Sequence, residues 1–217
     1  MARHAFLFDL DGVLVDTAVF HFQAWRRMAQ ELGFDIDEAF NETLKGISRM
    51  DSLDRILDRG KVTLTQEEKE AYAKRKNDWY LELVNLMTPA DVLPGVEDFL
   101  KAARSMNIQM ALGSASKNAP VILEKTGILP YFDAVIDGNH VSKSKPDPEV
   151  FLKGAAALQV TPAECVVFED AYAGIEAAKA AEMYAVGIGS AEVLSNADVV
   201  VPGFEGVTPE RFTHAMK

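Results

Sequence analysis

The stretch FLFDLDG, residues 6–12, ends an apolar segment in two carboxylates, Asp9 and Asp11, followed by Gly12. Side chains of a β-strand repeat every two residues, so the two carboxylates are expected to project to the same side. Gly12 then allows a sharp backbone turn. In open α/β sheets, ligands bind beyond the carboxyl ends of the strands. The stretch therefore predicts a ligand site, although an acidic turn at a strand end explains this short motif alone equally well.

Two carboxylates at one strand end repel each other unless a cation or a shared proton compensates. Phosphoryl transfer uses such a pair when one carboxylate is the nucleophile, the other is the general acid/base, and Mg²⁺ lies between carboxylate and phosphate. Ser114 ends a second apolar segment, Lys145 lies in a proline-rich stretch, and Glu169 and Asp170 end a third segment. Singly, these residues fit a turn, a solvated lysine and an acidic helix start. Together they supply a hydroxyl donor, a cation and metal ligands near strand ends.

Apolar segments that alternate with helical patterns predict an α/β fold, a doubly wound, Rossmann-like parallel sheet. The predicted strands are Ala5–Phe8, Ile108–Gly113, Ala134–Ile136, Cys165–Phe168, Tyr184–Ile188 and Asp198–Val201. The predicted helices between them are Val96–Met106, Ala119–Thr126, Pro148–Leu158 and Gly174–Glu182.

A long interval after the first predicted strand lacks a convincing strand and is rich in helix-forming residues. Thr17–Leu32 is amphipathic, Ser48 begins another helical pattern, and Thr65–Glu68 form a capping box before a helix that runs towards Leu86. The expected domains are an α/β core of residues 1–16 and 88–217 and an inserted all-helical domain of residues 17–87.

The charge balance and the single cysteine limit the function classes. The 217 residues carry 22 basic and 33 acidic side chains, a net charge of −11 at pH 7. We expect no nucleic-acid partner, because nucleic acids are usually bound by a basic stripe. Cys165 has no second cysteine to pair with, which fits a reducing compartment. Asp9 and Asp11 interrupt the first apolar stretch before a signal peptide could form, and no stretch reaches the ~18 apolar residues of a membrane span. The sequence thus predicts a cytoplasmic protein with no membrane partner.

Four motifs occur in the chain order Asp9-Leu10-Asp11-Gly12, Ser114, Lys145 and Glu169-Asp170. This ordered set resembles the haloacid dehalogenase (HAD) superfamily of phosphotransferases, and the helical insert resembles its cap domain. Within the superfamily the chain most resembles the β-phosphoglucomutase family, which interconverts β-D-glucose 1-phosphate and glucose 6-phosphate through β-glucose 1,6-bisphosphate. The segments that carry this narrower resemblance are Phe8–Val13, Asp16–Thr17, His21–Trp25, Phe40–Asn41, Leu44–Arg49, Asp51–Leu53, Lys74–Asn77, Pro89–Asp91 and Ser114–Asn118.

The resemblance implies a catalytic or metal-binding role for each core motif. Asp9 would be the nucleophile that becomes an aspartyl phosphate. Asp11 would be the general acid/base, and its backbone carbonyl would be a Mg²⁺ ligand. Glu169 and Asp170, with Asp9, would complete the metal site. The residues that would hold the transferring phosphoryl group are Ser114 and Lys145.

The resemblance also implies a site for the sugar and its second phosphate. The non-transferring phosphate would be held by Arg49, Ser116, Lys117 and Asn118, with Ala115 in the same loop. The sugar site would be lined by Trp25, Leu44, Lys45, Gly46, Ile47, Ser48, Ser52 and Lys76. His21 would position Asp11 or orient the sugar. Without the resemblance, packing roles for His21 and Trp25 and a solvated Lys76 are the simpler interpretations.

Two positions depart from the family pattern, and two other functions stay open. Gly113 stands where alanine is common, which predicts a looser loop, and Ala171 stands where a hydroxyl residue also occurs, which predicts a missing donor near the metal. The implied function is that of a monomeric enzyme using Mg²⁺ and glucose 1,6-bisphosphate on a sugar phosphate. A sugar-phosphate phosphatase with the same nucleophile is the alternative. A non-catalytic sugar-phosphate sensor is disfavoured, because all four carboxylates are present.

Overall fold

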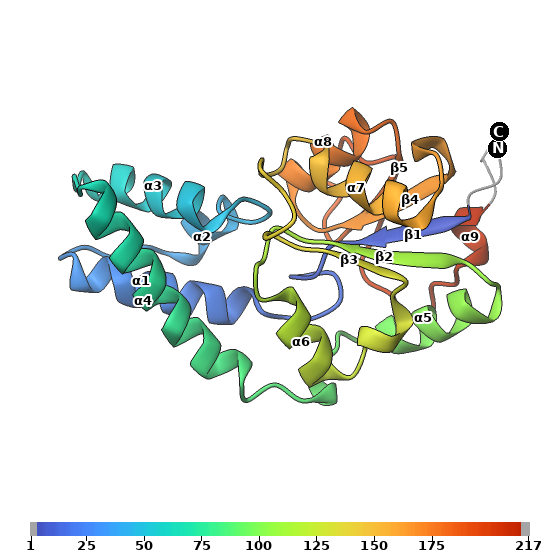
Figure 1. The fold of residues 1–217 in the computed structure, drawn as a ribbon, viewed down its shortest axis with the longest axis horizontal. Helices are drawn as coiled ribbons and strands as arrows, with labels where there is room; N and C mark the ends of the chain where they lie inside the picture. Colours follow the sequence, from blue (N-terminus) through green and yellow to red (C-terminus); the bar gives the residue numbers. More distant parts are fainter. Residues whose placement is uncertain (1–3, 214–217) are drawn as a thin grey trace.

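Six parallel strands form one sheet in the order β3-β2-β1-β4-β5-β6. Their bounds are β1 Ala5–Phe8, β2 Gln109–Gly113, β3 Ala134–Ile136, β4 Cys165–Glu169, β5 Tyr184–Ile188 and β6 Val199–Val201. In this computed structural model, which describes residues 4–213, β1 lies inside the sheet between β2 and β4 (Figure 1). The prediction of a parallel α/β sheet is confirmed, and each strand end falls within one residue of its predicted position.

Helices cover both faces of the sheet. One face packs on α5 (Val96–Ser105), α6 (Ala119–Thr126) and α9 (Glu210–Thr213), and the other on α7 (Glu149–Leu158) and α8 (Tyr172–Ala180). Single-turn 3₁₀ helices occur at η1 (Pro89–Asp91), η2 (Leu129–Tyr131) and η3 (Pro162–Glu164). The sequence did not predict these turns or α9, because such short elements show no helical periodicity. It also began α8 two residues late, at Gly174.

The β1 side chains alternate between the two cores. Phe6 and Phe8 join one hydrophobic cluster and Leu7 the other, and all three are fully buried. Phe8 stacks on Phe168 of β4 with 4.8 Å between ring centroids. Burial on both faces is typical of a parallel sheet covered by helices. Packing on both faces therefore fixes the position of β1 and of the carboxylates that follow it.

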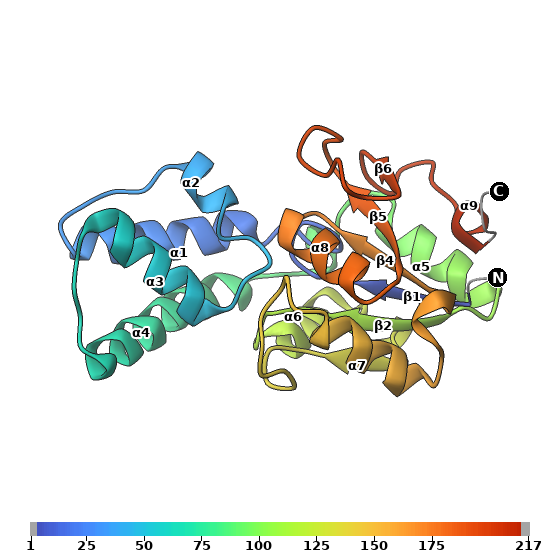
Figure 2. The same ribbon diagram turned by 90° about the horizontal axis from the view of Figure 1, so that it is seen from above.

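The helical insert consists of α1 (Ala18–Glu31), α2 (Glu38–Glu42), α3 (Arg49–Gly60) and α4 (Gln66–Val84). It lies beside the sheet, facing the carboxyl ends of the strands (Figures 1 and 2). It has a hydrophobic core of its own, which includes Trp25, Met28, Leu53 and Ile56. The inserted all-helical unit is thus confirmed. The domain bounds stay a prediction, and residues 1–3 and 214–217 of the predicted core lie outside the described residues.

The predicted helix starts in the insert are confirmed. Ser48 accepts a hydrogen bond from the Asp51 amide at the start of α3, and Thr65 forms a capping box with Glu68 at the start of α4. α4 ends at Val84, two residues before the predicted end. No helix within residues 4–213 is long and apolar enough to cross a membrane.

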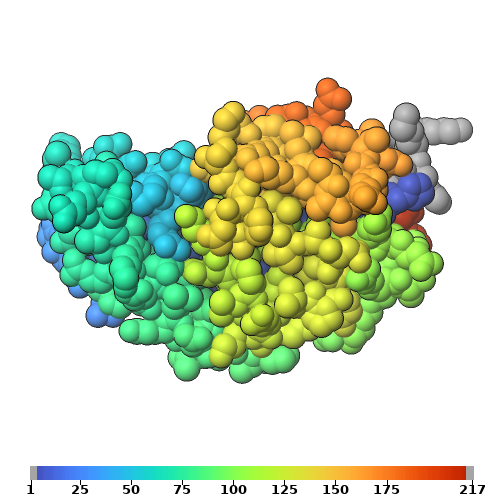
Figure 3. Space-filling view, viewed as in Figure 1, coloured from blue at the N-terminus to red at the C-terminus, as the bar shows by residue number. Residues whose placement is uncertain are grey.

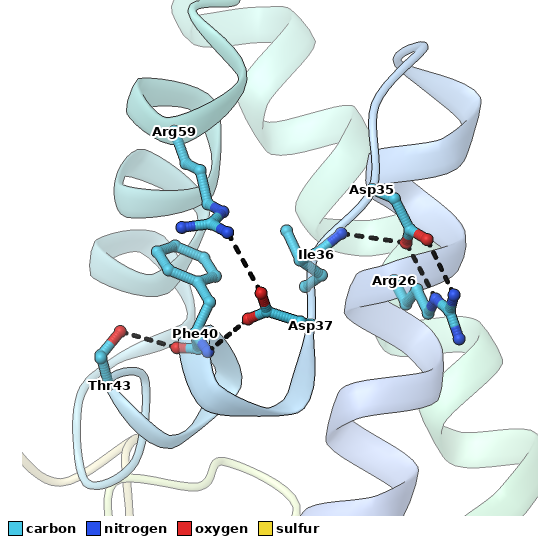
Figure 4. Close-up of polar contacts among 7 residues, drawn as sticks. All are labelled: Arg26, Asp35, Ile36, Asp37, Phe40, Thr43 and Arg59. Atoms are coloured by element: carbon cyan, nitrogen blue, oxygen red, sulfur yellow. Dashed lines mark hydrogen bonds and ion pairs between the residues drawn. The ribbon is translucent and has the colours of Figure 1, made fainter.

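The short helix α2 was not predicted, and contacts from other segments hold it in place. Asp37 accepts a hydrogen bond of 2.8 Å from the Phe40 amide and pairs with Arg59 of α3 at 3.3 Å (Figure 4). Nearby, Arg26 of α1 binds both carboxylate oxygens of Asp35 at 2.8 and 2.7 Å. A five-residue helix is marginal alone. The N-cap hydrogen bond and the ion pair of Asp37 with Arg59 therefore help to hold α2 in its helical form.

We expect Gly113→Ala to destabilise the fold. A Cβ at Gly113 would lie 2.9 Å from Cδ1 of Phe151, whose ring is fully buried. Overpacking of this kind costs about 1–3 kcal/mol. The free energy of unfolding in urea should fall by that amount, and Gly203→Ala, where nothing lies within 4 Å of the added methyl, should change it far less. Equal stability of the two variants would contradict the packing argument.

Candidate active site

Carboxylates from β1 and β4 meet at the carboxyl edge of the sheet. The Asp9 amide donates a 3.0 Å hydrogen bond to the carbonyl of Phe168, which fixes the end of β1 against β4. β4 ends in the fully buried Glu169, and Asp170 follows it. A Cβ at Gly12, whose φ is +78°, would collide with the Asp170 side chain. Glycine at position 12 therefore allows both the turn and the approach of Asp170.

Three carboxylates fit a divalent cation. Asp9, Glu169 and Asp170 each offer an oxygen, and these oxygens lie within 4.8 Å of one another. Burial, followed by the nearby Asp9 charge, raises the pKa of Glu169 well above its usual range. Burial also raises the pKa of Asp170 to about 6, although Lys45 opposes this shift. Clustered oxygens of this kind suit Mg²⁺, which would relieve their mutual repulsion.

Lys145 supplies a buried positive charge next to the carboxylates of the core. Its Nζ lies 2.6 Å from Oδ1 of Asp9 and 3.1 Å from Oε2 of Glu169, and the side chain is buried. Burial alone would lower the pKa of Lys145, but Asp9 and Glu169 raise it above its usual value. The ammonium therefore stays charged beside the proposed nucleophile, where it can hold a phosphoryl group.

Asp11 is held beside the insert. The Thr17 hydroxyl donates a hydrogen bond to Oδ1 of Asp11, and Nε2 of His21 lies 4.0 Å from the same oxygen. Burial, and secondly the charge of Asp9, raise the pKa of Asp11 to about 7. A carboxyl group with that pKa can both donate and accept protons near neutral pH. Sequence reasoning gave Thr17 no role, although Asp16–Thr17 is among the segments that resemble the family.

Two nitrogen atoms from α1 and α4 lie close together in the site. Nδ1 of His21 and Nζ of Lys76 are 2.9 Å apart, and the Lys76 ammonium lies over the rings of Trp25 and Tyr80. Burial, followed by the charge of Lys76, lowers the pKa of His21. Burial, followed by the charge of Arg49, lowers the pKa of Lys76. Lys76 is thus a buried residue of the site rather than a solvated helix lysine.

A cavity of about 710 Å³ lies between the insert and the strand ends. Every predicted site residue except Glu169 lines it, namely Asp9, Asp11, His21, Trp25, Leu44, Lys45, Gly46, Ile47, Ser48, Arg49, Ser52, Lys76, Ser114, Ala115, Ser116, Lys117, Asn118, Lys145 and Asp170. Glu169 is fully buried and contacts Lys145.

Arg49 provides a second cationic region, contributed by the insert. It is the first residue of α3, so it lies at a helix N-terminus, where anions are favoured. Its side chain is half-buried and forms no ion pair with any carboxylate of the described residues. Its planar fork suits bidentate phosphate binding. Cationic side chains from the core and from the insert, among them Lys145 and Arg49, thus line one cavity.

Polar contacts join the insert to the core at the cavity. Nδ2 of Asn118 donates to Oδ1 of Asn77 on α4 at 2.8 Å, and the Ser144 hydroxyl donates to Asp51 on α3. The space-filling view shows the two units in contact along this face (Figure 3). Sequence reasoning assigned no contact to Asn77, Asp51 or Ser144, because a contact between distant segments leaves no local pattern. These contacts describe a closed arrangement over the strand ends.

The chain is similar to known sugar-phosphate enzymes. A family model for haloacid dehalogenase-like hydrolase matches residues 4–182. β-Phosphoglucomutase from Bacillus subtilis is 44% identical over 208 residues, which are 95% of this chain and 92% of the relative. A crystal structure of β-phosphoglucomutase from Clostridium difficile has a TM-score of 0.93 and 46% identity, covering 96% of this chain and 95% of that chain. A phosphorylated carbohydrates phosphatase from Thermotoga maritima is 31% identical, over 82% of this chain and 81% of the relative. The chain therefore belongs to the haloacid dehalogenase-like hydrolase family.

Proposed function

We propose that the protein is a Mg²⁺-dependent β-phosphoglucomutase that interconverts β-D-glucose 1-phosphate and glucose 6-phosphate. The observation that carries this proposal is the pairing of two cationic regions in one cavity, Lys145 beside Asp9 and Arg49 on the insert. A sugar bisphosphate carries two phosphates, and both of them need a cationic region while the molecule is bound. The similarity to two β-phosphoglucomutases over nearly the whole chain supports the same function.

Asp9 and Asp11 divide the proposed chemistry between them. The Asp9 carboxylate attacks a phosphate of β-glucose 1,6-bisphosphate, and the sugar oxygen that leaves takes a proton from Asp11. In the next step Asp11 accepts the proton of the 6-hydroxyl of glucose 1-phosphate, which attacks the phosphoryl group on Asp9. The bisphosphate forms again, and it yields glucose 6-phosphate when its 1-phosphate is transferred to Asp9. The pKa of about 7 suits Asp11 to both directions.

Asp9, Glu169, Asp170 and the backbone carbonyl of Asp11 would hold the metal ion in this proposal. A bound Mg²⁺ supplies positive charge that neutralises carboxylate and phosphate oxygens. Lys145 and Ser114 would hold the transferring phosphoryl group in line with Asp9. These roles are proposals that rest on the clustered oxygens and the buried ammonium.

A mutase must admit a sugar hydroxyl and exclude water, whereas a phosphatase admits water. Arg49, with the loop of Ser116, Lys117 and Asn118, would hold the non-transferring phosphate in either orientation of the bisphosphate. The helical insert would act as a cap that closes over the bound sugar. A phosphatase with the same nucleophile differs only in the molecule that takes the phosphoryl group from Asp9, which is water and not a sugar hydroxyl. Product analysis therefore separates the two functions.

We propose that the cap spans residues 17–87 and the core residues 1–16 and 88–217. The two connections run side by side, because Val15 forms a bridge with Val92 and the Leu93 amide donates to the Leu14 carbonyl at 2.9 Å. Paired connections of this kind suit a hinge. One chain supplies every residue of the site, so we propose a monomer acting on a small sugar phosphate. The single cysteine, Cys165, fits a reducing compartment, so we propose a cytoplasmic location.

The direct test supplies β-D-glucose 1-phosphate, catalytic glucose 1,6-bisphosphate and Mg²⁺. We expect glucose 6-phosphate, measured with a coupled dehydrogenase assay, and little free phosphate. Asp9→Asn should give neither product while keeping its circular dichroism spectrum, because an amide cannot attack phosphorus as a carboxylate does. Stoichiometric glucose and free phosphate would instead identify a phosphatase.

Asp11→Asn should lower kcat by ~10²–10⁴, the usual range for general acid/base catalysis. The amide keeps the size of the side chain and the backbone carbonyl, so Mg²⁺ affinity measured by calorimetry should change little. A variant that lost Mg²⁺ affinity but reached wild-type kcat at saturating metal would contradict the acid/base role.

Arg49→Ala should lower kcat/KM for glucose 1-phosphate by roughly ten- to 150-fold, because a charged hydrogen bond contributes ~1.5–3 kcal/mol. Arg49→Lys should recover only part of this loss, since a point charge cannot reproduce the fork. Hydrolysis of acetyl phosphate, which has no second phosphate, serves as the control and should change much less. Equal losses on both substrates would assign Arg49 to the core site or the fold.

A further inference from the structure

Lys45 joins the helical insert to the metal-binding edge of the core. It lies in the loop between α2 and α3, and its Nζ is 2.9 Å from Oε2 of Glu42 and 3.1 Å from Oδ2 of Asp170. Glu42 belongs to the insert, whereas Asp170 follows β4 of the core. Burial opposes the charge of Lys45, but Asp170 and Glu42 raise its pKa, so the ammonium stays charged. One cation therefore bridges carboxylates from the two units.

The loop that carries Lys45 rests directly on the core. Gly46 has a φ of +75°, and a Cβ there would lie 3.3 Å from Cβ of Ala171 and 3.8 Å from Cδ of Lys145. A hydroxyl side chain at position 171 would have to fit beneath this loop, so the small alanine suits the close approach. Lys45 and Asp170 also line both the main cavity and a second one of about 460 Å³. Their ion pair thus lies where the two cavities adjoin.

The surroundings of Lys45 differ from those expected of a residue that binds a sugar. Both partners of its ammonium are carboxylates, and one of them, Asp170, belongs to the group whose oxygens lie within 4.8 Å of one another. A metal ion bound there would be a second cation on the same carboxylate. The metal ion and the Lys45 ammonium would repel each other, and this repulsion is weakly screened in a partly buried site.

We propose that Lys45 is a positioning residue that couples metal binding to closure of the insert, in place of the sugar-binding role expected from the sequence. The proposal rests on the metal site of the proposed function. The Lys45–Asp170 ion pair favours closure of the insert, and a metal ion on Asp170 weakens that pair. Because coupling between two equilibria is reciprocal, closure weakens metal binding by the same factor. The metal-loaded protein therefore opens more readily until a sugar phosphate bound to Arg49 favours closure.

Calorimetric titration of ligand-free protein with Mg²⁺ tests the coupling. Lys45→Met keeps the length of the side chain and removes the cation, so we expect Mg²⁺ to bind about five- to tenfold more tightly than to wild type, within the usual range of such coupling. Lys69→Met is the matched control, because it removes the same charge from the insert at an ion pair with Asp54. An equal Mg²⁺ affinity in the two lysine variants would overturn the proposal.

Small-angle scattering gives a second readout that a sugar-binding role would not affect. The radius of gyration of wild type and of Lys69→Met should increase when Mg²⁺ is added, whereas that of Lys45→Met should not respond. A similar increase in all three proteins would overturn the coupling, as would no response in wild type. Thermal unfolding of each variant checks that the fold is retained.

The variant Asp170→Asn tests the proposed metal site separately from the proposed role of Lys45. Loss of a carboxylate ligand should weaken Mg²⁺ binding by about tenfold or more, which is ~1.4 kcal/mol per factor of ten. If Asp170→Asn bound Mg²⁺ as tightly as wild type, the proposed metal site would be wrong, and the role of Lys45 with it. If Asp170→Asn lost affinity while Lys45→Met matched its control, only the role of Lys45 would be wrong.

Discussion

The ammonium of Lys145 lies 2.6 Å from Asp9 and 3.1 Å from Glu169, and all three side chains are buried. Buried carboxylates strongly disfavour ionisation unless a cation compensates them. Without Lys145, the neighbouring carboxylates of Asp9 and Glu169 would repel each other with no cation against them. The loop that carries Lys145 must therefore return to the carboxyl edge of the sheet, which places the β3–α7 connection over the end of β1.

That constraint also determines what the insert can contact. The loop containing Ser144 and Lys145 faces α3 of the insert, where Asp51 accepts a hydrogen bond from Ser144. Gly46 approaches Lys145 from the same side. The residue that fixes the charge of the core site is thus next to the contacts that close the insert. The contacts that close the insert and the position of the Lys145 ammonium are therefore parts of one arrangement.

The sequence predicted the features of the fold and the site that short-range patterns encode. Apolar strands, the caps at Ser48 and Thr65, and carboxylates at strand ends all follow from short-range periodicity, and a shared edge of the sheet then brings Asp9 and Asp170 together. Other features depend on segments that meet only after folding. The five-residue helix α2, the bond from Ser144 to Asp51 and the ion pair of Lys45 with Asp170 are of this kind. The direction of the Lys45 side chain could not be inferred, because its two carboxylate partners are 3 and 125 positions away.

The charge distribution along the cavity favours a bisphosphate over a compound with one phosphate. Lys145 of the core and Arg49 of the insert line the same cavity, whereas burial lowers the pKa values of His21 and Lys76, which also line it. A lowered pKa makes these nitrogens less prone to carry a proton, and both side chains can hydrogen-bond sugar hydroxyls. The pairing of cations from the two units in one cavity matches a sugar with a phosphate on two carbons. It also allows the sugar to bind in either direction, which a phosphomutase requires and a phosphatase does not.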